Sequence, residues 1–159
     1  CTAALKNYQA QEESVRQTRQ LYQAEGEIEK FVALAEDVHL LLDSAEYDSE
    51  DDAKAEAKAA YVEHLKTLAG GCTLPPDGTD TDVEFCTFTL IRANDAVRIE
   101  TKLKMELKYE VKKIKKQEPQ PDGTTKEVIK YTAKVSKAAH SYSTYTITHL
   151  TAEKGGTSE

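Results

Sequence analysis

The sequence predicts an α+β protein in which two N-terminal helices, the first of them long, pack on a four-stranded antiparallel meander that contains a long hairpin. Two observations predict this class. Apolar residues recur with a helical period before residue 70, whereas from residue 83 onward they alternate with polar residues, as in strands. The 159 residues are enough for one domain with its own core.

The first helix is expected over residues 3 to about 45, because its apolar residues repeat in heptads. Before residue 21 the repeat fails, so residues 1–20 are predicted to form a polar helical stalk. Residues 21–150 then form the single domain, and residues 151–159 a disordered tail. A heptad seam packs on the helix's own domain or on a partner helix, and the sequence leaves both open. The seam consists of Leu21, Ala24, Ile28, Phe31, Ala35, Val38, Leu42 and Ala45.

The second helix is expected to begin after Ser49 and to run to about residue 69. Ser49 has the character of an N-cap, with Asp52 three residues later at the spacing of a capping box. The acidic residues 50–52 favour the positive N-terminal end of a helix. Gly70 and Gly71 are expected to end it, because glycine tolerates the left-handed conformation that closes many helices.

Four strands are expected in the second half of the chain. They are residues 83–92, 97–112, 127–137 and 139–150. The second has the clearest pattern, since every odd position from 97 to 111 is uncharged and every even position from 98 to 112 is charged. Asp122-Gly123 predicts the turn that follows it. Helices lying against such a curved sheet resemble cystatin-like and NTF2-like domains, a likeness of shape that implies no function.

The net charge of -7 is unevenly distributed. Residues 1–82 carry 7 Lys and Arg against 18 Asp and Glu, whereas residues 83–159 carry 14 against 10. An acidic helical layer could therefore attract a basic sheet. The alternative is that both sets of charges only face water, because surface ion pairs contribute little.

Three cysteines, an odd number, suggest one pair and one remaining thiol. Cys72 and Cys86 lie on either side of a turn-rich segment, and a disulfide between them is expected. It would stabilise the fold by about 3 kcal/mol through the unfolded chain and would require an oxidising compartment. The alternative is two unrelated buried thiols, because a reduced cysteine packs like a small apolar residue.

The remaining cysteine is Cys1, which is followed by a polar, helix-favouring run. A chain that starts on cysteine resembles a mature bacterial lipoprotein, in which a signal peptide is cleaved just before that residue. The resemblance implies acyl chains on Cys1 and therefore a protein anchored in the bacterial cell envelope, on the outer membrane, facing the periplasm or the surface. The alternative is a fragment that begins at Cys1 by chance.

A basic knob is predicted at the end of the hairpin. Its residues are Lys112, Lys113, Lys115, Lys116 and Lys126. Such a cluster can contact anionic lipid, polysaccharide or an acidic protein face, or it can protect strand edges from aggregation. Nucleic acid is not expected as a partner, because the chain is acidic overall and no aromatic residues alternate with these lysines.

No catalytic or metal-binding constellation appears in the sequence. The four histidines, at positions 39, 64, 140 and 149, lack the spacing of metal ligands. His140 and His149 are nine residues apart and are expected on opposite faces of a strand. There is no glycine-rich phosphate loop and no nucleophile motif. We therefore expect no enzymatic activity, no metal and no cofactor.

These observations favour a non-enzymatic cell-envelope lipoprotein that acts as a structural or protein-interaction component of a surface or periplasmic assembly. Its partners would be the membrane, through the acyl chains, and either another protein or further copies of itself. The alternative is a small-ligand binding module with a pocket between the helices and the curved sheet. Tyr61, Tyr109 and Tyr131 would line that pocket.

Overall fold

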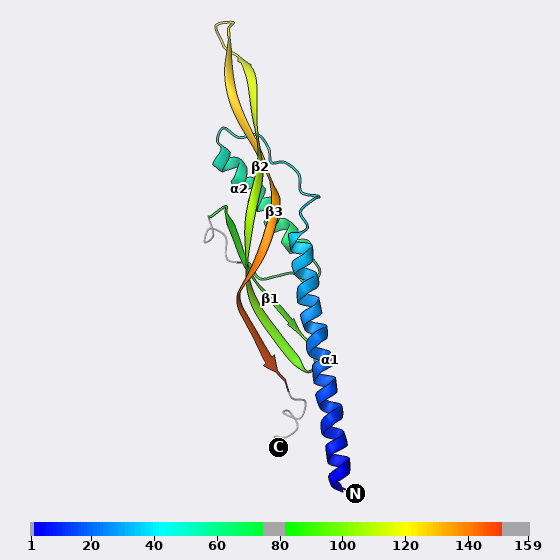
Figure 1. Cartoon of the computed structure of the whole chain (residues 1–159). Coiled ribbons are helices and arrows are strands. Elements are labelled where there is room, and N and C mark those ends of the chain that lie inside the picture. Colours follow the sequence, from blue (N-terminus) through cyan, green and yellow to red (C-terminus); the bar gives the residue numbers. More distant parts are fainter. Residues whose placement is uncertain (1, 75–81, 151–159) are drawn as a thin grey trace.

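The computed structural model describes residues 2–74 and 82–150, with side chains from residue 12 onward, and has an elongated α+β architecture (Figure 1). The three strands form one antiparallel sheet in the order β1-β2-β3, and both helices lie on the same face of it. The α+β class and the two N-terminal helices are as predicted. The elements are α1 (Thr2–Glu36), α2 (Glu50–Thr67), β1 (Phe85–Ala93), β2 (Val97–Pro119) and β3 (Thr125–His149).

The prediction of a four-stranded meander is wrong, because the last two expected strands are one. β3 runs without interruption through Ala138 and Ala139, which pair with Leu107 and Glu106 of β2. No glycine, proline, asparagine or aspartate stands between residues 125 and 149 to turn the chain. β2 is also longer than predicted, ending at Pro119, and β3 pairs along its whole length.

The pairing of β2 with β3 shifts register at two points, between Lys102 and Leu103 and between Lys108 and Tyr109. Each shift places an extra residue on β3, which locally bends and twists the strands. The turn that joins them is as predicted. Gly123 has φ 87°, and the Asp122 carboxylate accepts hydrogen bonds from the N–H and hydroxyl of Thr124, at 3.0 and 2.6 Å.

α1 ends at Glu36, earlier than predicted, although the heptad pattern continues. Its last carbonyls are satisfied by α2: the Tyr61 hydroxyl donates to Ala35 O at 2.7 Å, and His64 Nε2 lies 3.1 Å from Leu34 O. The chain then extends toward β3. Leu42, predicted to lie in the helix seam, is therefore 81% exposed.

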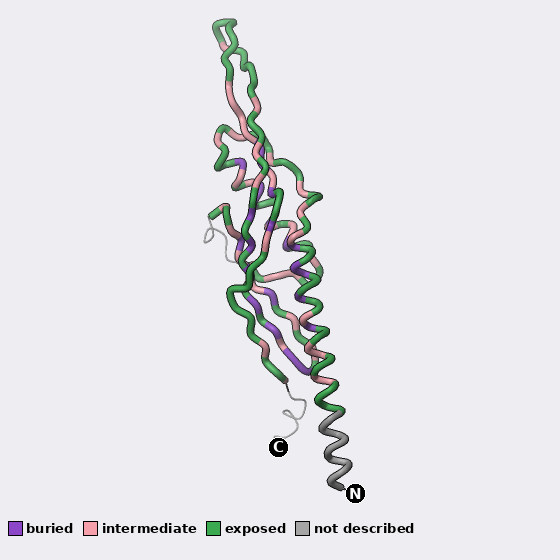
Figure 2. Tube along the Cα trace, in the orientation of Figure 1, coloured by how far each residue is buried: buried purple, intermediate pink, exposed green. Residues whose placement is uncertain are grey.

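The helix seam packs on the protein's own sheet. Ala24, Ile28, Phe31 and Ala35 are buried, and the rings of Phe31 and Phe88 lie 5.9 Å apart. Figure 2 shows this buried side of α1 facing the strands. Leu21 is partly buried at the start of the seam, whereas the partly buried Val38 lies beyond the helix end.

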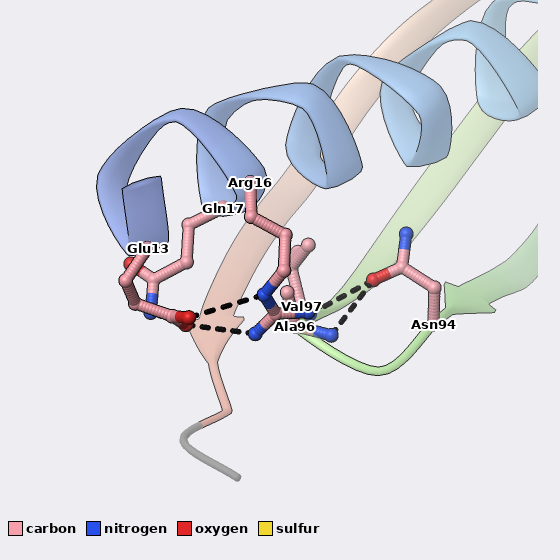
Figure 3. A network of polar contacts seen from close by, with 6 residues as sticks. All are labelled: Glu13, Arg16, Gln17, Asn94, Ala96 and Val97. Carbon is pink, nitrogen blue, oxygen red and sulfur yellow. Dashed lines mark hydrogen bonds and ion pairs between the residues drawn. The ribbon is translucent and has the colours of Figure 1, made fainter. Parts of the chain in front are cut away.

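α1 leaves the sheet near Gln20. There the Asn94 side chain in the β1–β2 turn donates to Gln20 O at 2.9 Å and accepts from the N–H groups of Ala96 and Val97. Figure 3 shows this turn beside the Glu13–Arg16 pair of the helix. Residues 12–15 are exposed, and the helix continues past the sheet (Figure 1). The predicted tail, residues 151–159, lies outside the described residues.

α2 begins as predicted. Ser49 accepts a hydrogen bond from Asp52 N–H at 3.1 Å, and three acidic residues occupy the first turn. Its buried side meets the sheet through Ala53, Ala57, Tyr61 and Leu65. The core is thus one layer of helix on one face of the sheet, while the charged residues of β2 keep the other face in water.

Candidate protein-interaction surfaces

A two-stranded arm, residues 112–130, projects at one end of the molecule, while the first turns of α1 project at the other (Figure 1). β1 pairs with β2 only as far as Glu106, so beyond it the long hairpin has no third strand from β1. Residues 115–127 are almost all exposed on both faces of the ribbon (Figure 2). An isolated two-stranded ribbon is only marginally stable, so contacts at its base must hold it.

The acidic loop between the helices supplies those contacts. Lys112 Nζ lies 3.1 Å from Asp43 Oδ2, Lys116 pairs with Glu46, and Lys130 Nζ lies 2.5 Å from Asp48 Oδ1. The hydrogen bond that Lys112 donates to the Asp43 carboxylate raises the pKa of Lys112. The attraction expected between the acidic and basic halves of the chain is therefore present as ion pairs between this loop and the base of the arm.

The predicted basic knob is thus divided. Lys112 and Lys116 point to the acidic loop. Among the described residues, Lys113, Lys115 and Lys126 form no ion pair and are exposed. The structure therefore leaves three of the five lysines available on the arm.

The same loop covers the outer edge of β3 near the arm. Ser44 N–H donates to Ala133 O at 2.7 Å, and Tyr47 and Tyr131 exchange two backbone hydrogen bonds of 2.9 and 2.8 Å. Farther along, Glu36 accepts from His140 N–H at 2.9 Å. Within the described part of the chain, no backbone group bonds the outer edge from residue 141 to 149.

An aromatic ladder lies along this open edge. The rings of His140 and Tyr142 are 5.2 Å apart, those of Tyr142 and Tyr145 are 5.3 Å apart, and both pairs meet edge to face. Tyr142 and Tyr145 are 40% and 39% exposed. This surface is not among those predicted from the sequence. The available signal was a Thr- and Tyr-rich run without a charged residue, but its exposure depends on β3 lying at the sheet edge.

The predicted disulfide is not formed in the structure, where Cys72 and Cys86 are both thiols. Thr73 and Thr89 exchange backbone hydrogen bonds of 2.8 and 2.9 Å in an antiparallel bridge. This register carries Cys72 toward Leu90 and away from Cys86, by roughly four residues or about 13 Å along the strand. A disulfide needs Cα atoms within about 7 Å. Cys1 lies outside the described residues.

The three tyrosines expected to line a ligand pocket are engaged in contacts within the protein. Tyr61 is fully buried, and its hydroxyl donates to Ala35 O. The Tyr109 hydroxyl donates to Val83 O at 2.5 Å. Tyr131 is half-buried and pairs through its backbone with Tyr47. Packing and hydrogen bonding thus occupy the residues on which the ligand-binding alternative was based.

His140 and His149 share a face of the sheet, contrary to prediction. They pair with Met105 and Val97, two odd positions of β2, because the bulge between Lys102 and Leu103 adds a residue to β3. They are nonetheless far apart along the strand. Within residues 2–74 and 82–150, no three His, Cys, Asp or Glu side chains gather as a metal site would require.

Comparison with known proteins gives no match among family models, curated proteins or solved structures. In the described part of the chain, neither helix is both long and apolar enough to cross a membrane. The candidate sites therefore rest on the chain's own geometry: the arm, the helical extension of α1 and the open edge of β3.

Proposed function

We propose that this chain is a non-enzymatic structural or protein-interaction component of a larger assembly, which it contacts through the arm. The arm carries the proposal, because its outer part is an ordered ribbon with both faces in water. Ordering a residue costs about 1–2 kcal/mol in backbone entropy. Among the described residues, the outer part of the arm has no contact with the protein's own core to offset this entropy cost, and burial against a partner would do so.

The exposed lysines give the arm its chemistry. Lys113, Lys115 and Lys126 suit an acidic protein face, because charge complementarity speeds and orients association. The half of α1 that passes the sheet is a second projecting element, with Val15 56% exposed. The two elements lie at opposite ends of the elongated body (Figure 1), so one molecule can touch two neighbours.

Site-specific photo-cross-linking in the cells that produce the protein tests this proposal. A photoreactive residue is placed at Lys115 or Lys126 on the arm, and at the exposed Glu63 of α2 as a matched control. We expect discrete cross-linked products from both arm positions and not from Glu63. Monomer alone at every position would contradict the proposal.

Localisation in the cell envelope remains a prediction, which rests on the resemblance of Cys1 to a lipidated cysteine. The intact mass of the protein from its native source tests it. Two or three acyl chains on the Cys1 peptide would support an anchored protein. An unmodified Cys1 would contradict the predicted anchor. The role of the arm would still be tested by cross-linking.

A further inference from the structure

The open edge of β3 differs in composition from its covered part. Residues 125–137, which include the β3 part of the arm, contain five charged residues, whereas residues 138–150 contain no Asp, Glu, Lys or Arg. Natural edge strands are usually protected by lysine, proline or a covering segment. Here the acidic loop covers the charged half, and the uncharged half is open beyond His140, whose N–H bonds Glu36.

The backbone register shows which groups this edge offers. Leu150 N–H donates to Ala96 O at 2.7 Å, on the β2 side. Because strand residues alternate, the N–H and C=O groups of Tyr145, Ile147 and His149 point away from β2. Their side chains lie on the helix-covered face, since they pair with the odd positions 101, 99 and 97 of β2.

An acidic row on α1 runs beside this edge. Glu25, Glu29 and Glu36 are spaced by four and seven residues and share one side of the helix. Glu36 fixes that side toward β3 through its hydrogen bonds with His140. Burial raises the pKa of Tyr145, and the nearby charges of Glu25 and Glu29 raise it further. Among the described residues, Glu25 and Glu29 have no ion-pair partner.

We infer that the open edge of β3 binds an extended segment of another protein by strand addition, and that this segment carries lysine or arginine at alternate positions. Its backbone bonds Tyr145, Ile147 and His149. Its basic side chains lie over the rings of Tyr142 and Tyr145 and reach Glu25 and Glu29. This site is separate from the arm, so the inference goes beyond the proposed function and stands or fails independently of it.

Charge also decides against a second copy of this chain as the occupant. Two β3 edges related by a two-fold axis would bring the Glu25 and Glu29 rows of both copies toward one another. The strand that each copy offered would contain no cation to neutralise them, because residues 138–150 are uncharged. An extended basic segment satisfies both the backbone groups and the carboxylates.

Titration of the full chain with synthetic peptides tests the inference. The probe is a ten-residue peptide alternating lysine with valine or threonine, and its matched control has glutamate in place of lysine. We expect calorimetry to show binding of the basic peptide that weakens with salt, with the acidic peptide at least about tenfold weaker. Amide hydrogen exchange should slow at Tyr145, Ile147 and His149.

Two sets of variants separate backbone from charge recognition. Ile147→Pro removes an outward N–H without removing a bond to β2, so it should abolish binding while Ile147→Ala retains it. Glu25→Lys with Glu29→Lys should reverse the preference toward the acidic peptide, whereas Glu63→Lys on α2 should not. This charge reversal keeps the test valid if Ile147→Pro fails to fold.

Any of three results with the peptides would overturn the inference: equal binding of both peptides, unchanged preference in the charge-reversed protein, or protection confined to another part of the chain. Concentration-dependent dimerisation that slows exchange at the same three amides would also overturn it, because the occupant would then be a second copy.

Discussion

Glu36 at the end of α1 holds the outer edge of β3 through two groups of His140, the backbone N–H and the ring nitrogen Nδ1. Its Oε2 accepts from the backbone N–H at 2.9 Å and lies 2.7 Å from Nδ1, across 104 positions of sequence. This pair fixes how the long helix is rotated over the sheet. It also marks where the covered edge of β3 ends and the open edge begins.

The pair predicts a pH-dependent contribution to stability. Burial alone would raise the pKa of Glu36, but hydrogen bonds and charge from His140 leave it below its usual 4.5. A carboxyl with a lowered folded-state pKa stabilises the fold above its unfolded pKa, and this is lost as pH falls through the folded value. We expect Glu36→Gln to cost about 1 kcal/mol at pH 7 and progressively less below about pH 4.5.

Urea unfolding of the two proteins at several pH values measures this difference. Glu63→Gln serves as the control, because Glu63 is exposed and, among the described residues, pairs with the exposed Lys66 alone; it should cost about 0–0.5 kcal/mol. A difference between Glu36→Gln and the natural protein that stays constant from pH 7 to 3 would contradict the assignment.

Asn94 should be a second point of attachment for α1. Its side chain makes three hydrogen bonds, to Gln20 O, Ala96 N–H and Val97 N–H, at 2.9, 3.0 and 3.1 Å. We expect Asn94→Ala to destabilise the protein by about 2 kcal/mol, because buried backbone groups lose their partners. Asn94→Asp keeps the two acceptor bonds and should cost less, as measured by thermal unfolding. Equal losses would show that only the bond to Gln20 matters.

Local sequence signals predicted the parts of the fold that neighbouring residues decide. The Ser49 cap, the Asp122-Gly123 turn and the alternation of β2 each depend on side chains within a few positions of one another. The end of α1 does not. The heptad continues to Leu42, but Ser44 and Tyr47 bond β3 and hold that segment extended, and apolar periodicity carries no information about such a distant partner.

The same distinction applies to the candidate sites. The lysines of the arm were predictable as a cluster, because they are close in sequence. Their division was not, since Lys112 and Lys116 are neutralised by Asp43 and Glu46 from another part of the chain. The open edge of β3 follows from the order of the strands in the sheet. That order was not predicted, because β3 was expected to be two short strands.

Two glycines should respond to alanine in opposite directions. Gly26 is exposed within α1, and a Cβ there would have no atom within 4 Å. Gly26→Ala should therefore stabilise the protein by about 0.5–1 kcal/mol. Gly70 has φ 79°, and a Cβ would lie 2.5 Å from Arg92 Nη2, so Gly70→Ala should destabilise it by at least about 1 kcal/mol. Chemical denaturation of both variants distinguishes them, and equal signs would contradict the backbone argument.

The cysteines give the last prediction. In protein purified without reductant, both Cys72 and Cys86 should accept an alkylating reagent after unfolding, because the Thr73–Thr89 register keeps them apart. In the folded protein Cys72 should react slowly at pH 8, since burial raises its pKa more than Arg92 and Lys66 lower it. Cys86, which is 1% exposed, should react only as the core opens.

Peptide mass spectrometry counts the modified cysteines. A disulfide-linked peptide in place of two alkylated cysteines would show that residues 72–74 adopt a different register along β1.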